Sequence, residues 1–276
     1  MTRILSFVGS IGRKTHLFFI EVARLSSLVQ NSFYWAFLAP LGGKRGLRRE
    51  SFAKQLVFMG NESLLIVALV AASVGSVLAL QAAYQLKQFG AVLYTGALVS
   101  VSMARELGPV VTAIVIAGRV GASITAELGT MKVQEEVDAL TTMGIPPIPF
   151  LVVPRILAIS IMLPSLTVLA DAIGMFGGLL IGVSSLGIAS GLYLQENFDG
   201  LVPKDLLTGV VKSAVFALLI GFIATYKGLS VEGGAEGVGR ATTESVVLSI
   251  IAIILSKNSE KSIIETAKIV FPLPSP

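Results

Sequence analysis

The chain has 276 residues, of which 54% are hydrophobic and only 14% charged, and its mean hydropathy is +0.83. This composition exceeds what a water-soluble core needs, and at ~20 apolar residues per crossing the length has room for about five transmembrane helices with short connections. The absence of cysteine excludes disulfides and thiolate metal sites, and nine of the 21 Lys and Arg precede residue 55, which favours a juxtamembrane basic segment over nucleic-acid binding.

The N-terminal segment mixes aromatic and aliphatic side chains with polar ones. Residues 17–41 include Glu21 and Arg24, which predicts an amphipathic helix at the membrane interface. The alternative, a first transmembrane helix, would place both charges in hydrocarbon. A basic run follows at 44–49, and no signal-peptide core or organelle import leader is recognisable, so residues 1–55 are expected to remain as an interfacial segment.

Two apolar stretches come next. Residues 63–86 carry no charge and would span about 36 Å as a helix, which predicts a first transmembrane helix. Residues 91–118 form a second stretch, but Arg105 and Glu106 interrupt it and a Gly-Pro pair follows directly. A broken or bent helix is therefore expected there.

Three further apolar stretches follow. Residues 156–186 and 206–226 are long enough to cross, the latter around Lys212, whereas residues 245–256 are too short to span unaided. This fifth stretch could tilt in a thinned bilayer, continue through 262–271, or end inside the membrane, and the sequence does not choose between these alternatives. The predicted fold is an all-α, polytopic membrane protein with about five transmembrane helices after an interfacial helix.

The basic residues predict the orientation. If the segments before residue 63, 119–155 and 227–240 share one side, that side holds 14 of the 21 Lys and Arg, and the opposite loops hold only Lys87 and Lys204. Because basic loops stay in the cytoplasm, the N-terminus is expected to be cytoplasmic.

Charges inside apolar stretches mark candidate sites. Arg105 and Glu106 would each cost roughly 2.5–3.5 kcal/mol at a bilayer centre, so they are expected to face a partner or a wet cavity unless they lie at a helix end near the headgroups. Lys212 raises the same question, although it could extend to the interface. Gly174, Gly178 and Gly182 form one helix face for close packing, against the same chain or a second copy.

Residues 126–143 predict a short cytoplasmic amphipathic helix, which would either dock into a partner or lie on the membrane surface as a solvated connector, and docking is favoured. Its apolar side chains recur at mostly helical spacing against acidic ones, and an acidic face suits a partner's groove better than anionic lipid headgroups. The apolar positions are Leu128, Met131, Val137, Leu140 and Met143, and the charged ones are Glu127, Lys132, Glu135, Glu136 and Asp138.

Several sequence motifs do not meet the requirements of a nucleotide-binding, metal or catalytic site. Residues 9–15 lack the Gly-Lys-[Ser/Thr] ending of a phosphate-binding loop, so the chain is not expected to bind ATP. The glycine cluster 233–239 is interpreted as a flexible cytoplasmic turn. His16 is the only histidine and has no metal-ligand partners, so no metal site, no cofactor and no hydrolase constellation is expected.

Three segments resemble the MlaE-type permeases closely: ARELGPVVTAIVIAGRVGASITAELGTMKVQEEVDALTTMGI at 104–145, LVVPR at 151–155 and GRATTESVV at 239–247. The match runs from about 52 to 256, with a permease domain expected at 56–256. Members of that family are the membrane subunits of ABC transporters that move phospholipids or other lipids with MCE-domain proteins. The tail, 257–276, departs from the family because its last helix usually continues apolar.

The resemblance implies a homodimer that transports lipid and leaves ATP hydrolysis to a separate ATPase subunit. It implies that 126–143 is the cytoplasmic coupling helix, which would contact that ATPase through Glu127, Leu128, Met131, Glu135, Asp138 and Met143. It places a phospholipid cavity at Arg105, Glu106 and Lys212, with Leu78 and Gln81 as weaker candidates. Cationic groups suit a headgroup phosphate, and Glu106 would hold Arg105 in place or disfavour tight anion capture.

A competing hypothesis is a membrane scaffold or assembly factor that docks an ATPase without moving lipid. Copurification of a lipid-stimulated ATPase would separate the two. The location implied is a bacterial inner membrane, with a plastid inner envelope as the alternative.

Overall fold

The computed structural model describes residue 20, residues 23–38 and residues 49–258. Every regular element within these residues is a helix and none is a strand, which confirms the all-α prediction. Five helical segments are long and apolar enough to cross a membrane, so the polytopic architecture is confirmed as well. They are Glu50–Lys87, Val92–Val133, Ile148–Ser184, Pro203–Leu229 and Gly234–Lys257.

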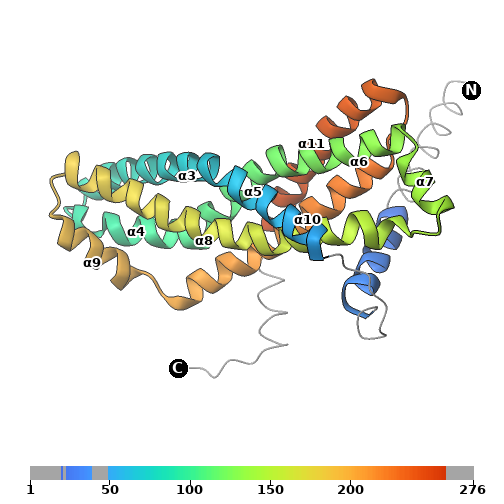
Figure 1. The fold of residues 1–276 in the computed structure, drawn as a ribbon. Coiled ribbons are helices and arrows are strands. Elements are labelled where there is room, and N and C mark those ends of the chain that lie inside the picture. Colours follow the sequence, from blue (N-terminus) through green and yellow to red (C-terminus); the bar gives the residue numbers. More distant parts are fainter. Residues whose placement is uncertain (1–19, 21–22, 39–48, 259–276) are drawn as a thin grey trace, which may run out of the picture.

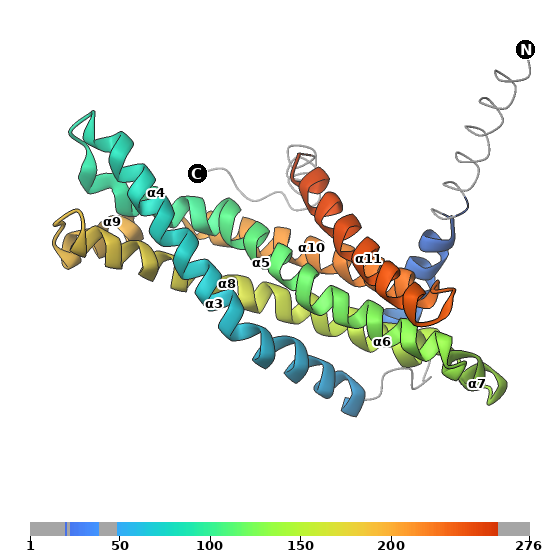
Figure 2. The same ribbon diagram turned by 90° about the horizontal axis from the view of Figure 1, so that it is seen from above.

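The long helices form an elongated bundle (Figures 1 and 2). Helix α3 (Arg49–Lys87) packs along α8 (Val153–Ser184), and α10 (Pro203–Leu229) contacts α8 as well as α11 (Gly234–Asn258). The short helix α7 (Glu136–Thr142) lies at one end of this bundle (Figure 1). The main core consists of buried aliphatic side chains, among them Val67, Ile124, Leu163 and Ile220.

Small residues bring α3 and α8 into close contact. A Cβ on Gly75 would meet the backbone of Gly174, and a Cβ on Gly177 would meet the backbone of Ala72. The Ser76 hydroxyl donates a hydrogen bond of 3.0 Å to the Gly177 carbonyl across the same contact. The two helices therefore touch backbone to backbone, the arrangement that small residues allow in membranes.

The second crossing segment bulges and does not break. It begins with η2 (Val92–Tyr94) and α4 (Thr95–Ser102) and continues without interruption into α6 (Ala122–Val133). Two π-helical turns, η3 (Met103–Leu107) and η4 (Ala117–Gly121), flank α5 (Gly108–Ile116). A widened turn directly before Pro109 accommodates the residue that lacks an N–H, so the expected break is replaced by a bulge.

The fifth crossing helix is longer than expected. Gly233 and Gly234 have positive φ angles of 89° and 71°, and α11 then runs as one helix to Asn258. Its 24-residue crossing segment would span about 36 Å. The predictions of a short fifth stretch and of a flexible turn over 233–239 are therefore wrong.

Because the first half of α11 contains polar residues, the sequence predicted a helix that was too short. Ser245 is fully buried, and the Thr125 hydroxyl donates to its Oγ over 2.9 Å. Glu244 pairs with Lys227 of α10 over 2.9 Å. Because neighbouring helices provide these partners, the polar residues fit inside the bundle and the helix continues through them.

Residues 23–33 are helical and are followed by η1 (Tyr34–Leu38). Leu28 is buried against Val152, Ile156 and Phe222, and the Phe33 ring lies 6.0 Å from the Phe222 ring. The described part of the predicted interfacial helix thus packs on η5 (Ile148–Val152), α8 and α10. Glu21 and the basic run at 44–48 lie outside the described residues.

Candidate substrate site

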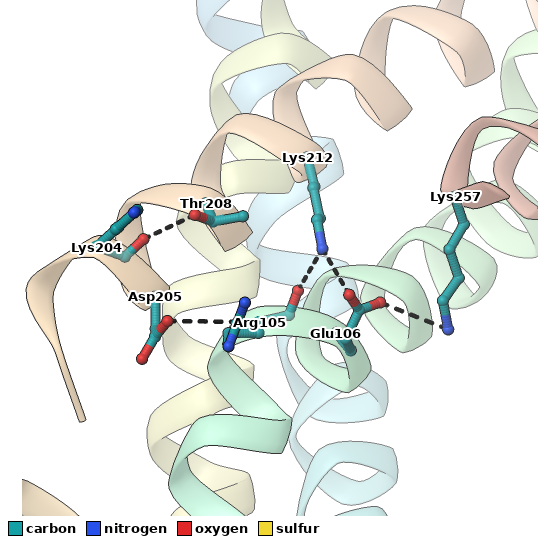
Figure 3. Close-up of polar contacts among 7 residues, drawn as sticks. All are labelled: Arg105, Glu106, Lys204, Asp205, Thr208, Lys212 and Lys257. Atoms are coloured by element: carbon teal, nitrogen blue, oxygen red, sulfur yellow. Dashed lines mark hydrogen bonds and ion pairs between the residues drawn. The ribbon is translucent and has the colours of Figure 1, made fainter. Parts of the chain in front are cut away.

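The π-helical turn η3 carries the two charges that interrupt the second crossing segment. Arg105 and Glu106 are neighbours within this turn, inside a helical segment of 42 residues. Met103 and Ala104, which begin the same turn, are buried in the bundle. The turn therefore fixes its apolar side in the protein and directs its two charged side chains toward the neighbouring helices α10 and α11 (Figure 3).

Glu106 lies between two lysines (Figure 3). The Lys212 ammonium donates a hydrogen bond of 2.8 Å to Glu106 Oε1, and the Lys257 ammonium lies 3.5 Å from Glu106 Oε2. Lys212 also donates to the Arg105 carbonyl over 2.9 Å. One carboxylate thus connects η3 to the middle of α10 and to the end of α11.

Arg105 has a different partner. Its Nε lies 3.4 Å from Asp205 Oδ1, in the first turn of α10. The sequence analysis proposed that Glu106 could hold Arg105 in place, but the structure pairs Glu106 with Lys212 and Lys257. Asp205 holds Arg105 instead, as Figure 3 shows.

Gly209 allows α10 to approach the bulge closely. A Cβ at this position would meet the carbonyl oxygen of Ala104, so only glycine fits without a backbone shift. Lys212 follows three residues later on the same helix face, within reach of Glu106.

Sequence reasoning missed Asp205, Gly209 and Lys257. Asp205, two residues after the helix-starting Pro203, was the only one with a recognisable signal, an acid in a first turn.

Leu78 and Gln81 lie in a separate apolar groove. The groove has a volume of about 260 Å³ and is bounded on its other side by Leu107, the residue after Glu106. Its other lining residues are Ser73, Val74 and Val77 of α3. A surface suited to an acyl chain therefore begins beside the charged turn.

The segment expected to dock a partner is not one helix. It consists of the end of α6, a left-handed residue at Glu135 with φ of 60°, and α7. Glu135, Asp138 and Met143 are exposed, the last to 65%. The Lys132 ammonium binds both Asp138 carboxylate oxygens at 3.0 Å, which connects α6 to α7 across the bend.

The apolar face of this segment mostly covers the protein's own core. Leu128 is fully buried, Val137 is 8% exposed, and Met131 packs partly buried against the same cluster. Glu127 pairs with Arg155 of α8 over 3.0 Å. The expectation that Leu128 contacts a partner is therefore revised, because its side chain has no accessible surface. The surface left for docking is the acidic edge with Met143.

The glycine face of α8 packs within this chain. Gly174 lies against Met103 and the Ala71 carbonyl. Gly178 and Gly182 lie against Tyr193 of α9 (Ser190–Gly200), whose side chain is fully buried. In the part of the chain that the structure describes, all three glycines thus accommodate neighbouring segments of the same molecule.

The protein-family model for the permease MlaE matches residues 52–258, which is most of the chain. The matched region contains the charged turn, both of its lysine partners and the bend between α6 and α7. The chain belongs to the MlaE permease family. This confirms the family to which the three sequence segments pointed.

Relatives of the MlaE permease family extend the match over nearly the whole chain. A probable ABC transporter permease protein of Rickettsia bellii is 39% identical over 92% of this chain and 95% of its own. The intermembrane phospholipid transport system permease protein MlaE of Haemophilus influenzae is 34% identical over 91% of this chain and 94% of its own. A probable ABC transporter permease protein of Synechocystis is 42% identical over 80% of this chain and 83% of its own.

Proposed function

We propose that this chain is the permease subunit of an ABC transporter that moves phospholipids between the membrane and an MCE-domain partner. A separate ATPase subunit would drive the movement. The observation that supports this most is the Glu106–Lys212 pair, in which a nearly buried ammonium lies inside a bundle of crossing helices. The next residue, Leu107, lines an apolar groove against α3. A phospholipid needs the same combination, cationic groups for its phosphate and apolar surface for its tails.

The ATPase would bind the acidic edge around the bend between α6 and α7. Glu135, Glu136 and Asp138 are exposed there, next to Met143. The bend itself is fixed to the bundle through Val137 in the core and through the Glu127–Arg155 pair. A movement of the bend would therefore be passed to α8, which is the property that coupling to ATP hydrolysis requires.

The transporter would contain two copies of this chain. Only 17% of the most apolar window of α11 is buried within the protomer, which is the lowest share among the five crossing segments. Its exposed side includes Val247, Leu248, Ile251 and Ile254. An apolar face of this kind is compatible with a second copy as well as with lipid.

Reversing the acidic edge is expected to abolish ATPase binding. In the double variant Glu135→Lys with Asp138→Lys, two exposed acids become bases beside Lys132, so an ATPase surface complementary to acids would be repelled. Copurification of the ATPase should fall at least tenfold, while membrane insertion stays normal. A matched double reversal on α9, Glu196→Lys with Asp199→Lys, should retain the ATPase. Equal ATPase recovery from both double variants would refute the docking assignment.

The location proposed is the inner membrane of a bacterium, with a cytoplasmic N-terminus. Since the chain has no cysteine, a single Ala235→Cys substitution, in the first turn of α11 and on the same predicted side as the bend between α6 and α7, provides an exposed thiol with no background. A membrane-impermeant maleimide should label it in inside-out vesicles and not in right-side-out spheroplasts. Labelling in intact spheroplasts would show the reverse orientation.

A further inference from the structure

We propose that Lys257, at the end of α11, selects phospholipids whose headgroup carries a net negative charge. This inference rests on the proposed function, because it assigns a headgroup class to the same site. No part of the sequence pattern singled out this lysine, which stands where the apolar run of α11 stops. The fold brings it to the Glu106 carboxylate (Figure 3).

The two lysines at Glu106 are held differently. Lys212 has a side chain only 12% exposed and donates to both Glu106 and the Arg105 carbonyl. Lys257 has a side chain 45% exposed and lies 3.5 Å from Glu106, a longer contact than the 2.8 Å of Lys212. Exposed pairs at such distances contribute little stability. Lys257 can therefore leave the carboxylate for an incoming phosphate, whereas Lys212 is anchored.

The charges of the cluster do not balance. Arg105, Lys212 and Lys257 provide three positive charges, and Glu106 and Asp205 provide two negative ones. One positive charge remains in excess in this cluster, and the exposed Lys204 at the start of α10 would add to it. Phosphatidylglycerol has one negative charge, on its phosphate, and a neutral glycerol, so it would neutralise the cluster of five side chains.

A zwitterionic headgroup fits this arrangement less well. Its phosphate would bind the cations equally, but its ammonium would need a carboxylate. After Lys257 turns to the phosphate, Glu106 still faces Lys212 and Asp205 still faces Arg105 (Figure 3). An ammonium without a carboxylate partner would be repelled by the excess positive charge of the cluster. The cluster should consequently prefer phosphatidylglycerol to phosphatidylethanolamine.

The test uses the intact complex extracted from vesicles of equimolar phosphatidylglycerol and phosphatidylethanolamine, with bound lipid quantified by mass spectrometry. The wild type should be enriched in phosphatidylglycerol. Lys257→Gln removes the excess positive charge on which the discrimination depends, so it should lower the ratio of the two lipids by about fivefold to tenfold. Lys257→Arg, which keeps the charge, should preserve the ratio, and so should the control Lys54→Gln at the exposed start of α3.

The outcomes separate the inference from the proposed function. An unchanged lipid ratio in Lys257→Gln, with total bound phospholipid also unchanged, would overturn the inference and leave the transporter proposal standing. A wild-type complex without any bound phospholipid would overturn the proposed function and the inference together. An equal loss of both lipids in Lys257→Gln would show a structural role and would likewise overturn the selectivity.

Discussion

Glu106→Gln is expected to lower phospholipid transfer by the assembled transporter at least tenfold while raising the amount of phospholipid bound to the extracted complex. The carboxylate now neutralises Lys212 and Lys257, at 2.8 and 3.5 Å. Without it, both ammonium groups would bind a headgroup phosphate instead. Tighter binding of the ground state slows release, so lipid accumulates in the site as turnover falls.

The chain contains a close structural match for the control. Glu244 of α11 pairs with Lys227 of α10 over 2.9 Å, so this pair also joins two crossing segments, and the exposures of its two side chains resemble those of the Glu106–Lys212 pair. Glu244→Gln should therefore reproduce any general effect of losing an interhelical ion pair, without the change in bound lipid. If Glu106→Gln lowered transfer and bound lipid together, and lowered thermal stability as Glu244→Gln does, Glu106 would be only a packing residue.

Gly75→Ala is expected to destabilise the protein strongly, because the added methyl group would meet the backbone of Gly174. Backbone cannot rotate away as a side chain can, so α3 and α8 must separate along their shared contact. Overpacking of this kind costs about 1–3 kcal/mol or more. The midpoint of thermal unfolding in detergent, followed by loss of the monodisperse gel-filtration peak, should fall by several degrees.

The matched substitution is Gly118→Ala, in the π-helical turn η4. A Cβ there would have no neighbour within 4 Å in the described residues. Alanine favours a helix over glycine by about 1 kcal/mol, so this variant should be neutral or slightly stabilised. The two substitutions are chemically identical and should act in opposite directions. A similar fall in the unfolding midpoint of both variants would mean that the glycines are needed for helix geometry and not for the close contact of α3 with α8.

The crossing helices could be predicted from sequence wherever apolar residues were continuous. Prediction failed for α11, because Glu236, Arg240 and Glu244 resemble the charged residues of a loop until Lys227, the partner of Glu244, is known. At Arg105 and Glu106 the sequence predicted a broken or bent helix, and the structure excludes the break. The π-helical turn η3 resolves the same strain while keeping the helix continuous.

The candidate site was predicted in part. The cost of charge in a membrane drew attention to Arg105, Glu106 and Lys212, and the structure brings all three together. Asp205 and Lys257 were missed because each lies near a helix end, where a charged residue is ordinary. The segment 126–143 was predicted to dock through its acidic face, with Leu128, Met131 and Met143 among the contacts. Periodicity alone cannot tell whether a partner or the protein's own core covers an apolar position, and here the core covers Leu128 and part of Met131.

The most direct test of the proposed transporter is native mass spectrometry of the detergent-extracted complex, purified through this chain. We expect two copies of the chain with two ATPase subunits, an MCE-domain protein and bound phospholipid. The matched measurement on Glu106→Gln should show the same subunits with more lipid. A solitary chain that carries no lipid would contradict the account and favour a scaffold without transport.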